Sequence, residues 1–140
     1  MKNPKRLHTV LIAMGSNFKQ QTSIKMAKQM IACTYEIVQF CDPLWTEPIG
    51  MDNRRKFLNT MAVVRTVRSK LQVECSMKYI QTRCKRKRSR KARGVIDMDL
   101  DLMYYDGEMF HTDDLQRDYM KQLMAQAEEM IPEIEKIETW

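Results

Sequence analysis

The chain has 140 residues, 44% of them hydrophobic, and a formal net charge of +6, which suits one domain over residues 1–140 and excludes a disordered chain. No apolar run approaches the roughly 20 residues of a membrane span, and no charged–apolar–small leader opens the sequence, so we expect a cytoplasmic protein without a membrane partner. Four cysteines without CxxC spacing and two isolated histidines predict reduced thiols and disfavour a zinc site.

The first 40 residues predict a strand, a helix and a second strand. Residues 7–15 are rich in β-branched and apolar side chains and run into the turn signal GSN, which is typical of a strand end. A helix follows, and Thr22 or Ser23 can cap its start. Its apolar face comprises Ile24, Ala27, Met30 and Ile31. Residues 35–40 alternate between apolar and polar side chains and predict the second strand.

The middle of the chain predicts a long loop, a strand and a second helix. Two prolines and a glycine punctuate residues 41–53, which indicates a loop. The apolar, β-branched residues 57–66 predict the third strand. Ser69 then caps a helix. The apolar face of this helix comprises Val73, Met77, Ile80 and Cys84.

Residues 85–93 read KRKRSRKAR and predict an exposed basic loop at the boundary between two oppositely charged parts of the chain. Residues 1–96 hold 21 basic and 5 acidic side chains, whereas residues 97–140 hold 3 basic and 13 acidic ones. The loop is open to three interpretations: a solvated surface, a nucleic-acid or localisation patch, or a source of arginines for phosphate. Acidic residues follow this basic loop directly. The basic loop and these acids together suggest a phosphate site with metal-binding carboxylates.

A fourth strand is predicted after the basic loop, in which Asp97, Asp99 and Asp101 alternate with apolar residues before the turn signal YDGE. In a strand these three carboxylates share one face. Neighbours about 6–7 Å apart repel by about 2–3 kcal/mol at an effective dielectric of ~20. Either water screens this repulsion or a cation lies between the acids, and the pattern alone leaves both possibilities open.

A final helix completes the predicted fold. Its apolar stripe comprises Leu123, Ala127, Met130 and Ile134. We expect Pro132 to interrupt or end this helix. The element order therefore predicts an α+β fold: a ferredoxin-like βαββαβ sandwich with an extra C-terminal helix.

The order of five motifs resembles the 6-hydroxymethyl-7,8-dihydropterin pyrophosphokinase family. These motifs are GSN, TEPIG, FLNTMAVV, the basic segment and DLDLMYYDGE, and the resemblance covers residues 9–108. It implies an ATP-dependent enzyme of folate biosynthesis that transfers pyrophosphate from ATP to the hydroxymethyl group of a reduced pterin and releases AMP. The implied partners are these two small molecules, and we expect a monomer or weak dimer.

The resemblance also implies the metal site. Two aspartates separated by one residue hold two Mg²⁺ ions in that family, and Asp99 and Asp101 align with them without a gap in LMYYDGE. Such a pair suits Mg²⁺, which binds one or two carboxylates together with substrate phosphates and water. Asp97 is then an additional acid, which either assists or is only solvated.

For ATP, the same gapless count places Arg86 and Arg88 where the family uses a catalytic pair of arginines on the triphosphate. Arginine binds phosphate bidentately and keeps its charge. Gln81 and Leu102 are the other ATP-binding candidates. No GxxxxGK[ST] motif is present, so side-chain charge has to replace a backbone phosphate cradle.

For the pterin, the resemblance points to the long loop and the third strand. The implied residues are Thr46, Pro48, Ile49, Gly50, Phe57 and Asn59. A flat heteroaromatic ring needs an aromatic side chain to stack on, and its amide-like edge needs paired donors and acceptors. Phe57 has core packing as its alternative role, whereas an asparagine inside an apolar strand is costly unless it has polar partners.

Departures from the family pattern motivate one alternative, and the basic run KRKRSRKAR motivates another. Ile96 stands where the family has an arginine, and the segment after YYDGE lacks the family's proline–histidine order, so His111, Arg117 and Tyr119 receive no role from the sequence. The first alternative is a catalytically degenerate relative that binds nucleotide or pterin without turnover. The second is a nucleic-acid-binding module, which the adjacent acids and the lack of stacking aromatics disfavour.

Overall fold

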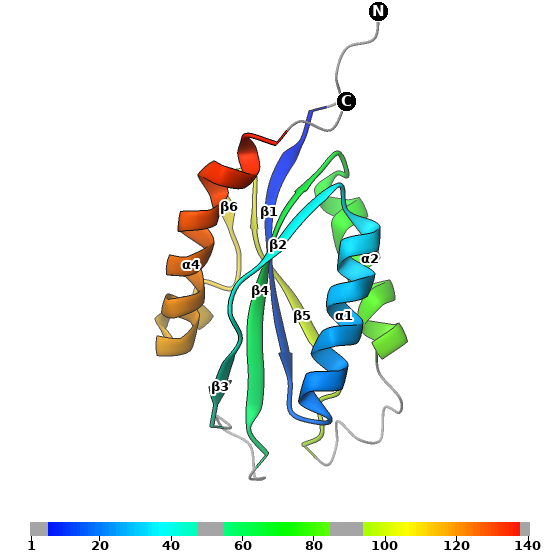
Figure 1. Ribbon diagram of the computed structural model, residues 1–140, viewed down its shortest axis with the longest axis vertical. Coiled ribbons are helices and arrows are strands. Elements are labelled where there is room, and N and C mark those ends of the chain that lie inside the picture. The colour runs from blue at the N-terminus through cyan, green and yellow to red at the C-terminus, as the bar shows by residue number, and fades with distance from the viewer. Residues whose placement is uncertain (1–5, 48–54, 85–93, 138–140) are drawn as a thin grey trace, which may run out of the picture.

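An antiparallel sheet lies at the centre of the computed structural model, which describes residues 6–47, 55–84 and 94–137 (Figure 1). The strand order is β2-β4-β1-β5-β6, and β3 pairs with β4 on the same side as β2. The strands are β1 (His8–Ser16), β2 (Ile37–Phe40), β3 (Leu44–Thr46), β4 (Phe57–Thr66), β5 (Asp99–Tyr105) and β6 (Glu108–Met109). The helices are α1 (Gln20–Thr34), α2 (Lys70–Cys84), α4 (Asp118–Glu135) and the short 3₁₀ helix η1 (Asp114–Gln116).

Helices cover both faces of this sheet. Figure 1 shows α1 and α2 on one side and α4 on the other. The strands therefore bury side chains in two directions. In β1, Val10, Ile12 and Met14 join the core under α1 and α2, whereas Leu11 and Ala13 join the core under α4. The predicted α+β class and the additional C-terminal helix are confirmed.

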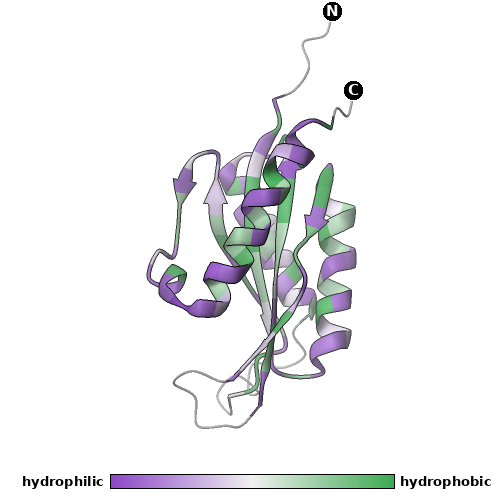
Figure 2. Cartoon of the chain, turned by 60° about the vertical axis from the view of Figure 1, so that its left-hand side comes forward, coloured by the Kyte–Doolittle hydropathy of each residue, from purple (hydrophilic) through white to green (hydrophobic). Residues whose placement is uncertain are grey.

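Apolar periodicity explains why these segments pack as they do. The central strands are largely hydrophobic, and the helices alternate between hydrophobic and hydrophilic residues (Figure 2). The predicted inner faces of α1 and α2 are buried, except that Met30 is only partly so. In α4 the buried residues are Met120, Leu123, Ala127 and Ile134. None of the helices in the described ranges is long and apolar enough to cross a bilayer.

Ser69 caps α2 as predicted, through a reciprocal pair of hydrogen bonds. The Gln72 backbone N–H donates to Ser69 Oγ over 3.2 Å, and the Ser69 backbone N–H donates to Gln72 Oε1 over 2.8 Å. This capping box satisfies donors that a helix start otherwise leaves without partners.

The predicted helix boundaries are wrong in two places. Helix α1 begins at Gln20 rather than near Thr22, and Lys19 precedes it in a left-handed conformation (φ 45°) without a side-chain cap. Helix α4 continues through Pro132 to Glu135. Pro132 has no backbone N–H to donate to the preceding turn, yet the helix continues for three residues beyond it.

Asp97 does not belong to the acidic strand, which corrects a second expectation. Strand β5 begins at Asp99, and Asp97 lies before it with only 5% of its surface exposed. The preceding backbone is held by the buried Asn17. Asn17 Nδ2 donates to the Gly94 carbonyl over 2.8 Å, and the Ile96 N–H donates to Asn17 Oδ1 over 2.6 Å. These bonds fix the approach of the chain to β5, which begins at Asp99.

Two short strands were also missed by sequence reasoning. Strand β3 lies inside the predicted loop over residues 41–53, and β6 pairs with the end of β5. The turn between β5 and β6 has positive φ at Asp106 (44°) and Gly107 (98°), as Asp-Gly hairpin turns require. The predicted basic loop over residues 85–93 lies outside the described residues.

The α2 cap yields a stability prediction. Replacing Ser69 by Ala removes one side of the capping box, and we expect the free energy of unfolding to fall by about 1 kcal/mol. The matched control is Thr22→Ala, an exposed residue in the first turn of α1, for which we expect a change within about 0.5 kcal/mol. Urea denaturation followed by circular dichroism measures both variants, and equal losses would contradict the assigned caps.

Candidate active site

The register of β1 with its two neighbours places residues from three sequence motifs in one row. Gly15 pairs with Asn59 of β4 on one side and with Asp99 of β5 on the other. Two residues away, Ala13 pairs with Asp101 in the same way. Residues directly opposite one another in antiparallel strands share a face of the sheet. The acids of β5 and the amide of β4 therefore lie on the same face, separated only by the small residues of β1.

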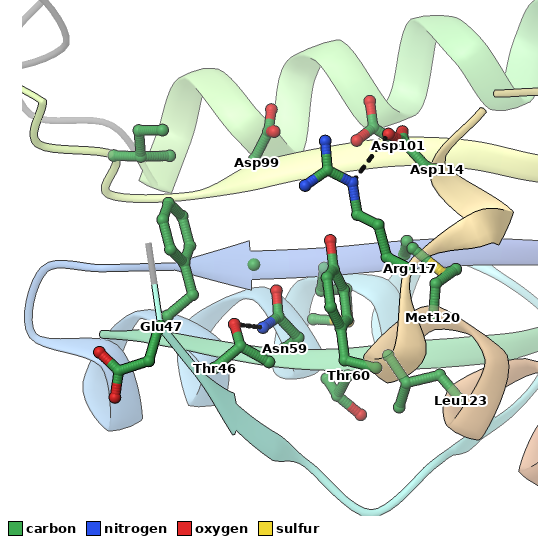
Figure 3. A pocket seen from close by; sticks show the side chains of 16 residues that line it. Thr46, Glu47, Asn59, Thr60, Asp99, Asp101, Asp114, Arg117, Met120 and Leu123 are labelled. Carbon is green, nitrogen blue, oxygen red and sulfur yellow. Dashed lines mark hydrogen bonds and ion pairs between the residues drawn. The ribbon is translucent and has the colours of Figure 1, made fainter. Parts of the chain in front are cut away.

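A pocket of about 250 Å³ opens over this row, between the sheet, the end of β3 and the start of α4 (Figure 3). It brings together five of the site residues expected from sequence. These are Thr46, Phe57, Asn59, Asp99 and Asp101. The expected residues Pro48, Ile49, Gly50, Arg86 and Arg88 lie outside the described residues.

Asn59 and Thr46 form the amide side of the pocket. Asn59 Nδ2 donates to Thr46 Oγ1 over 2.8 Å, and only 7% of the Asn59 surface is exposed (Figure 3). This bond uses one donor of the carboxamide and fixes its plane. The hydroxyl hydrogen of Thr46 and the oxygen of Asn59 then form a donor–acceptor pair suited to an amide-like ligand edge.

Asp99 and Asp101 form the acidic side. Asp99 is exposed, the side chain of Asp101 keeps 39% of its surface exposed, and His111 Nε2 lies 3.9 Å from Asp101 Oδ1. No group of three or more His, Cys, Asp or Glu side chains in the described ranges is placed to hold a metal ion. Two accessible carboxylates do suit Mg²⁺ that takes its other oxygen ligands from phosphate and water.

Arg117 supplies positive charge to the same pocket, although the sequence assigned it no role. It precedes α4, and its Nε lies 3.5 Å from Asp114 Oδ1. Figure 3 shows its guanidinium extending to the side of the pocket where Asp99 and Asp101 lie. Among the described residues it is the only Lys or Arg that lines this pocket, so it is placed to meet an anionic ligand.

Tyr119 is the second residue that sequence reasoning missed. It lines the pocket together with Phe57, which gives the pocket two aromatic side chains. Burial raises the pKa of the Tyr119 hydroxyl, Arg117 opposes this shift, and the carboxylates of Asp114, Asp101 and Asp99 add to it. Arg117 and Tyr119 lie two residues apart at the start of α4, and no local pattern in the sequence shows that this helix end packs over the sheet.

A second pocket of about 280 Å³ lies on the other side of the two acids, against α2. Gln81 and Leu102 line it, and Asp99 and Asp101 line both pockets. Gln81 Oε1 accepts the Leu100 N–H over 2.9 Å, so its oxygen already has a partner on β5. The Leu102 side chain belongs to the core under α1 and α2.

Comparison with known proteins identifies a family for this chain. The model of the 7,8-dihydro-6-hydroxymethylpterin-pyrophosphokinase family matches residues 11–129, which extends from β1 into α4. No curated protein matches the chain. The resemblance inferred from motifs over residues 9–108 is therefore confirmed at the family level, and the matched region includes Arg117 and Tyr119.

The position of Tyr119 beside the two acids yields a spectroscopic prediction. A tyrosinate next to carboxylates is disfavoured, so these acids raise its pKa, and replacing Asp101 by Asn should lower the pKa of Tyr119. Absorbance titration near 295 nm, with the Tyr119→Phe variant subtracted in each background, isolates this hydroxyl. Asp113→Asn, an exposed acid outside the pocket, is the control and should leave the value unchanged. An unchanged pKa in Asp101→Asn would contradict the geometry.

Proposed function

The chain belongs to the 7,8-dihydro-6-hydroxymethylpterin-pyrophosphokinase family, and from that premise we propose that it transfers pyrophosphate from ATP to the hydroxymethyl group of 6-hydroxymethyl-7,8-dihydropterin. The product AMP leaves, and the pterin diphosphate serves folate biosynthesis. One observation carries the proposal: a paired amide and hydroxyl, Asn59 and Thr46, share a pocket with two accessible carboxylates, Asp99 and Asp101.

In the proposed complex the pterin occupies the pocket between the sheet and α4. Its amide-like edge pairs with Asn59 and Thr46, and its ring packs against Phe57 and Tyr119, which supply aromatic surface. We also propose that Pro48, Ile49 and Gly50, the loop residues implied by the family resemblance, bind the pterin. Support comes from the chemistry of this pocket, in which the polar side chains of Asn59 and Thr46 lie beside aromatic side chains.

The family uses ATP together with Mg²⁺, and Asp99 and Asp101 are the residues that we propose to hold the metal. Bound Mg²⁺ neutralises charge on the triphosphate and aligns its phosphate groups. We propose that two Mg²⁺ ions bind, as the family resemblance implies. The chain's own contribution is a pair of carboxylates in successive outward positions of β5, where phosphate and water can complete the ligand set.

The proposed reaction is a direct displacement without a covalent enzyme intermediate. A bond forms between the hydroxymethyl oxygen of the pterin, which gives up its proton to solvent, and the β-phosphorus of ATP. The bond from that phosphorus to the oxygen shared with the α-phosphate breaks, and this oxygen leaves with AMP. The protein positions both substrates and stabilises the negative charge of the phosphates. Arg117, which faces the acidic side of the pocket, joins Arg86 and Arg88 in this role.

Nucleotide binding against α2 and a ferredoxin-like topology complete the proposal. The second pocket, which Gln81 and Leu102 line, adjoins the two acids and suits the rest of the ATP molecule. The order β2-β4-β1-β5 with antiparallel neighbours supports a βαββαβ arrangement. We further propose that residues 1–140 act as one domain.

The alternative function is that of a family relative that binds its ligands without turnover. Ile96 lines the pocket at the position where the family has an arginine, so one cation of the expected set is replaced by an apolar side chain. Each charge-assisted contact contributes about 1.5–3 kcal/mol. Release of AMP separates the two functions, because a binding protein without turnover forms none at high protein concentration.

The proposed function predicts the effect of removing one carboxylate. With ATP, Mg²⁺ and the reduced hydroxymethyl pterin, the native chain should release AMP, and Asp101→Asn should lower the rate by about 100-fold or more. Asp113→Asn makes the same charge change outside the pocket and should keep the native rate. Chromatographic separation of AMP from ATP measures all three. Equal rates for the two variants would contradict the role of Asp101, and ligand binding without AMP release in the native chain would favour the alternative.

A further inference from the structure

We propose that Gly15 is a positioning residue of the pterin pocket, because its missing side chain leaves room for the carboxamide oxygen of Asn59. This inference rests on the proposed function and adds to it the reason why Asn59 can present an acceptor to the ligand. Three observations carry it: the backbone conformation at Gly15, the space beside it, and the hydrogen bond that orients Asn59.

The backbone of β1 does not require glycine at this position. The described glycines with positive φ are Gly94 and Gly107, at 77° and 98°, and Gly15 is not among them. Glycine inside a strand weakens it, because the unfolded chain loses more conformational freedom and no side chain packs. An alanine at position 15 would therefore suit the strand at least as well, and the reason for glycine has to lie in space.

The space beside Gly15 is already taken by Asn59. A Cβ atom placed on Gly15 would lie 3.0 Å from Asn59 Oδ1, closer than an ordinary van der Waals contact. Its next neighbour would be Phe57 Cδ1 at 3.9 Å, which is an ordinary contact. No atom of Asp99 or Asp101 is found within 4 Å of this Cβ. The obstruction therefore affects the amide side of the pocket and spares the acidic side.

Asn59 is held in place by a hydrogen bond and by burial. Its Nδ2 donates to Thr46 Oγ1, and its side chain is buried except for 7% of the residue surface. A methyl group on residue 15 would push Oδ1 away and turn the carboxamide against that bond. The hollow over Gly15 thus keeps Oδ1 open to the pocket, where it can accept a hydrogen bond from a ligand N–H. A pterin supplies such donors through its ring N–H and exocyclic amine.

The test is direct binding by Gly15→Ala. With Mg²⁺ and the non-hydrolysable α,β-methylene analogue of ATP present, calorimetric titration with 6-hydroxymethyl-7,8-dihydropterin should show an affinity at least about tenfold lower than that of the native chain. Affinity for the nucleotide analogue should stay within about twofold, because no metal-site atom meets the added methyl group. In steady-state kinetics the KM for the pterin should rise while the KM for ATP stays constant. Pterin affinity within twofold of the native value would overturn the inference.

The double variant Gly15→Ala with Asn59→Ala is the matched control. If the methyl group acts through Asn59, adding it to Asn59→Ala should cause no further loss of pterin affinity. A further tenfold loss would overturn the inference, because the methyl group would then act by another route. Should Gly15→Ala alone fail to fold, a folded double variant supports the clash with Asn59, and an unfolded double variant contradicts it.

Failure of the inference and failure of the proposed function are distinguishable. If the native chain does not bind the pterin, the proposed function fails and Gly15 has no pterin to position. If the native chain binds it and Gly15→Ala binds it equally well, only the role of Gly15 is lost. Thermal unfolding of each variant shows whether the fold is retained.

Discussion

The pairing register of β1 is the constraint on which the candidate site depends. This strand hydrogen-bonds to β4 on one side and β5 on the other, so one strand decides which residues of both neighbours share a face. A shift of one residue would turn Asn59 or Asp99 to the opposite face, under α1 and α2. Asn17, directly after β1, prevents this on the β5 side, since its side chain binds the backbone of Gly94 and Ile96.

Alternation along β5 lets one strand stabilise the fold and supply chemical groups. Leu100 and Leu102 are buried under α1 and α2, and burial of such side chains contributes about 1.5–3 kcal/mol each. Asp99 and Asp101 face the other way, where their mutual repulsion costs stability. Solvent screens these partly exposed carboxylates, so the apolar face offsets the cost. The strand can therefore keep two like charges close together until a cationic ligand binds between them.

Local pattern was enough to predict the longer helices and strands, but it missed the short strands β3 and β6 and part of the site. Strand β4 and the Ser69 cap follow from the side chains of consecutive residues, and the metal and amide candidates follow from motifs within single strands. Arg117 and Tyr119 reach the pocket only because α4 packs across the sheet, which no local pattern records. A search for functional side chains could not identify Gly15, because glycine contributes here by having no side chain.

The two pockets meet at the acids, and this placement explains how a single strand could serve two substrates. One pocket is bounded by β3, β4 and α4, and the other by α2 and the outer side of β5, while Asp99 and Asp101 line both. Under the proposed function, the pterin hydroxyl and the ATP phosphates approach these carboxylates from opposite sides. The protein then needs no large closed cavity for the reaction, because the shared β5 edge brings the reacting atoms together. The position of that edge is again set by its pairing with β1.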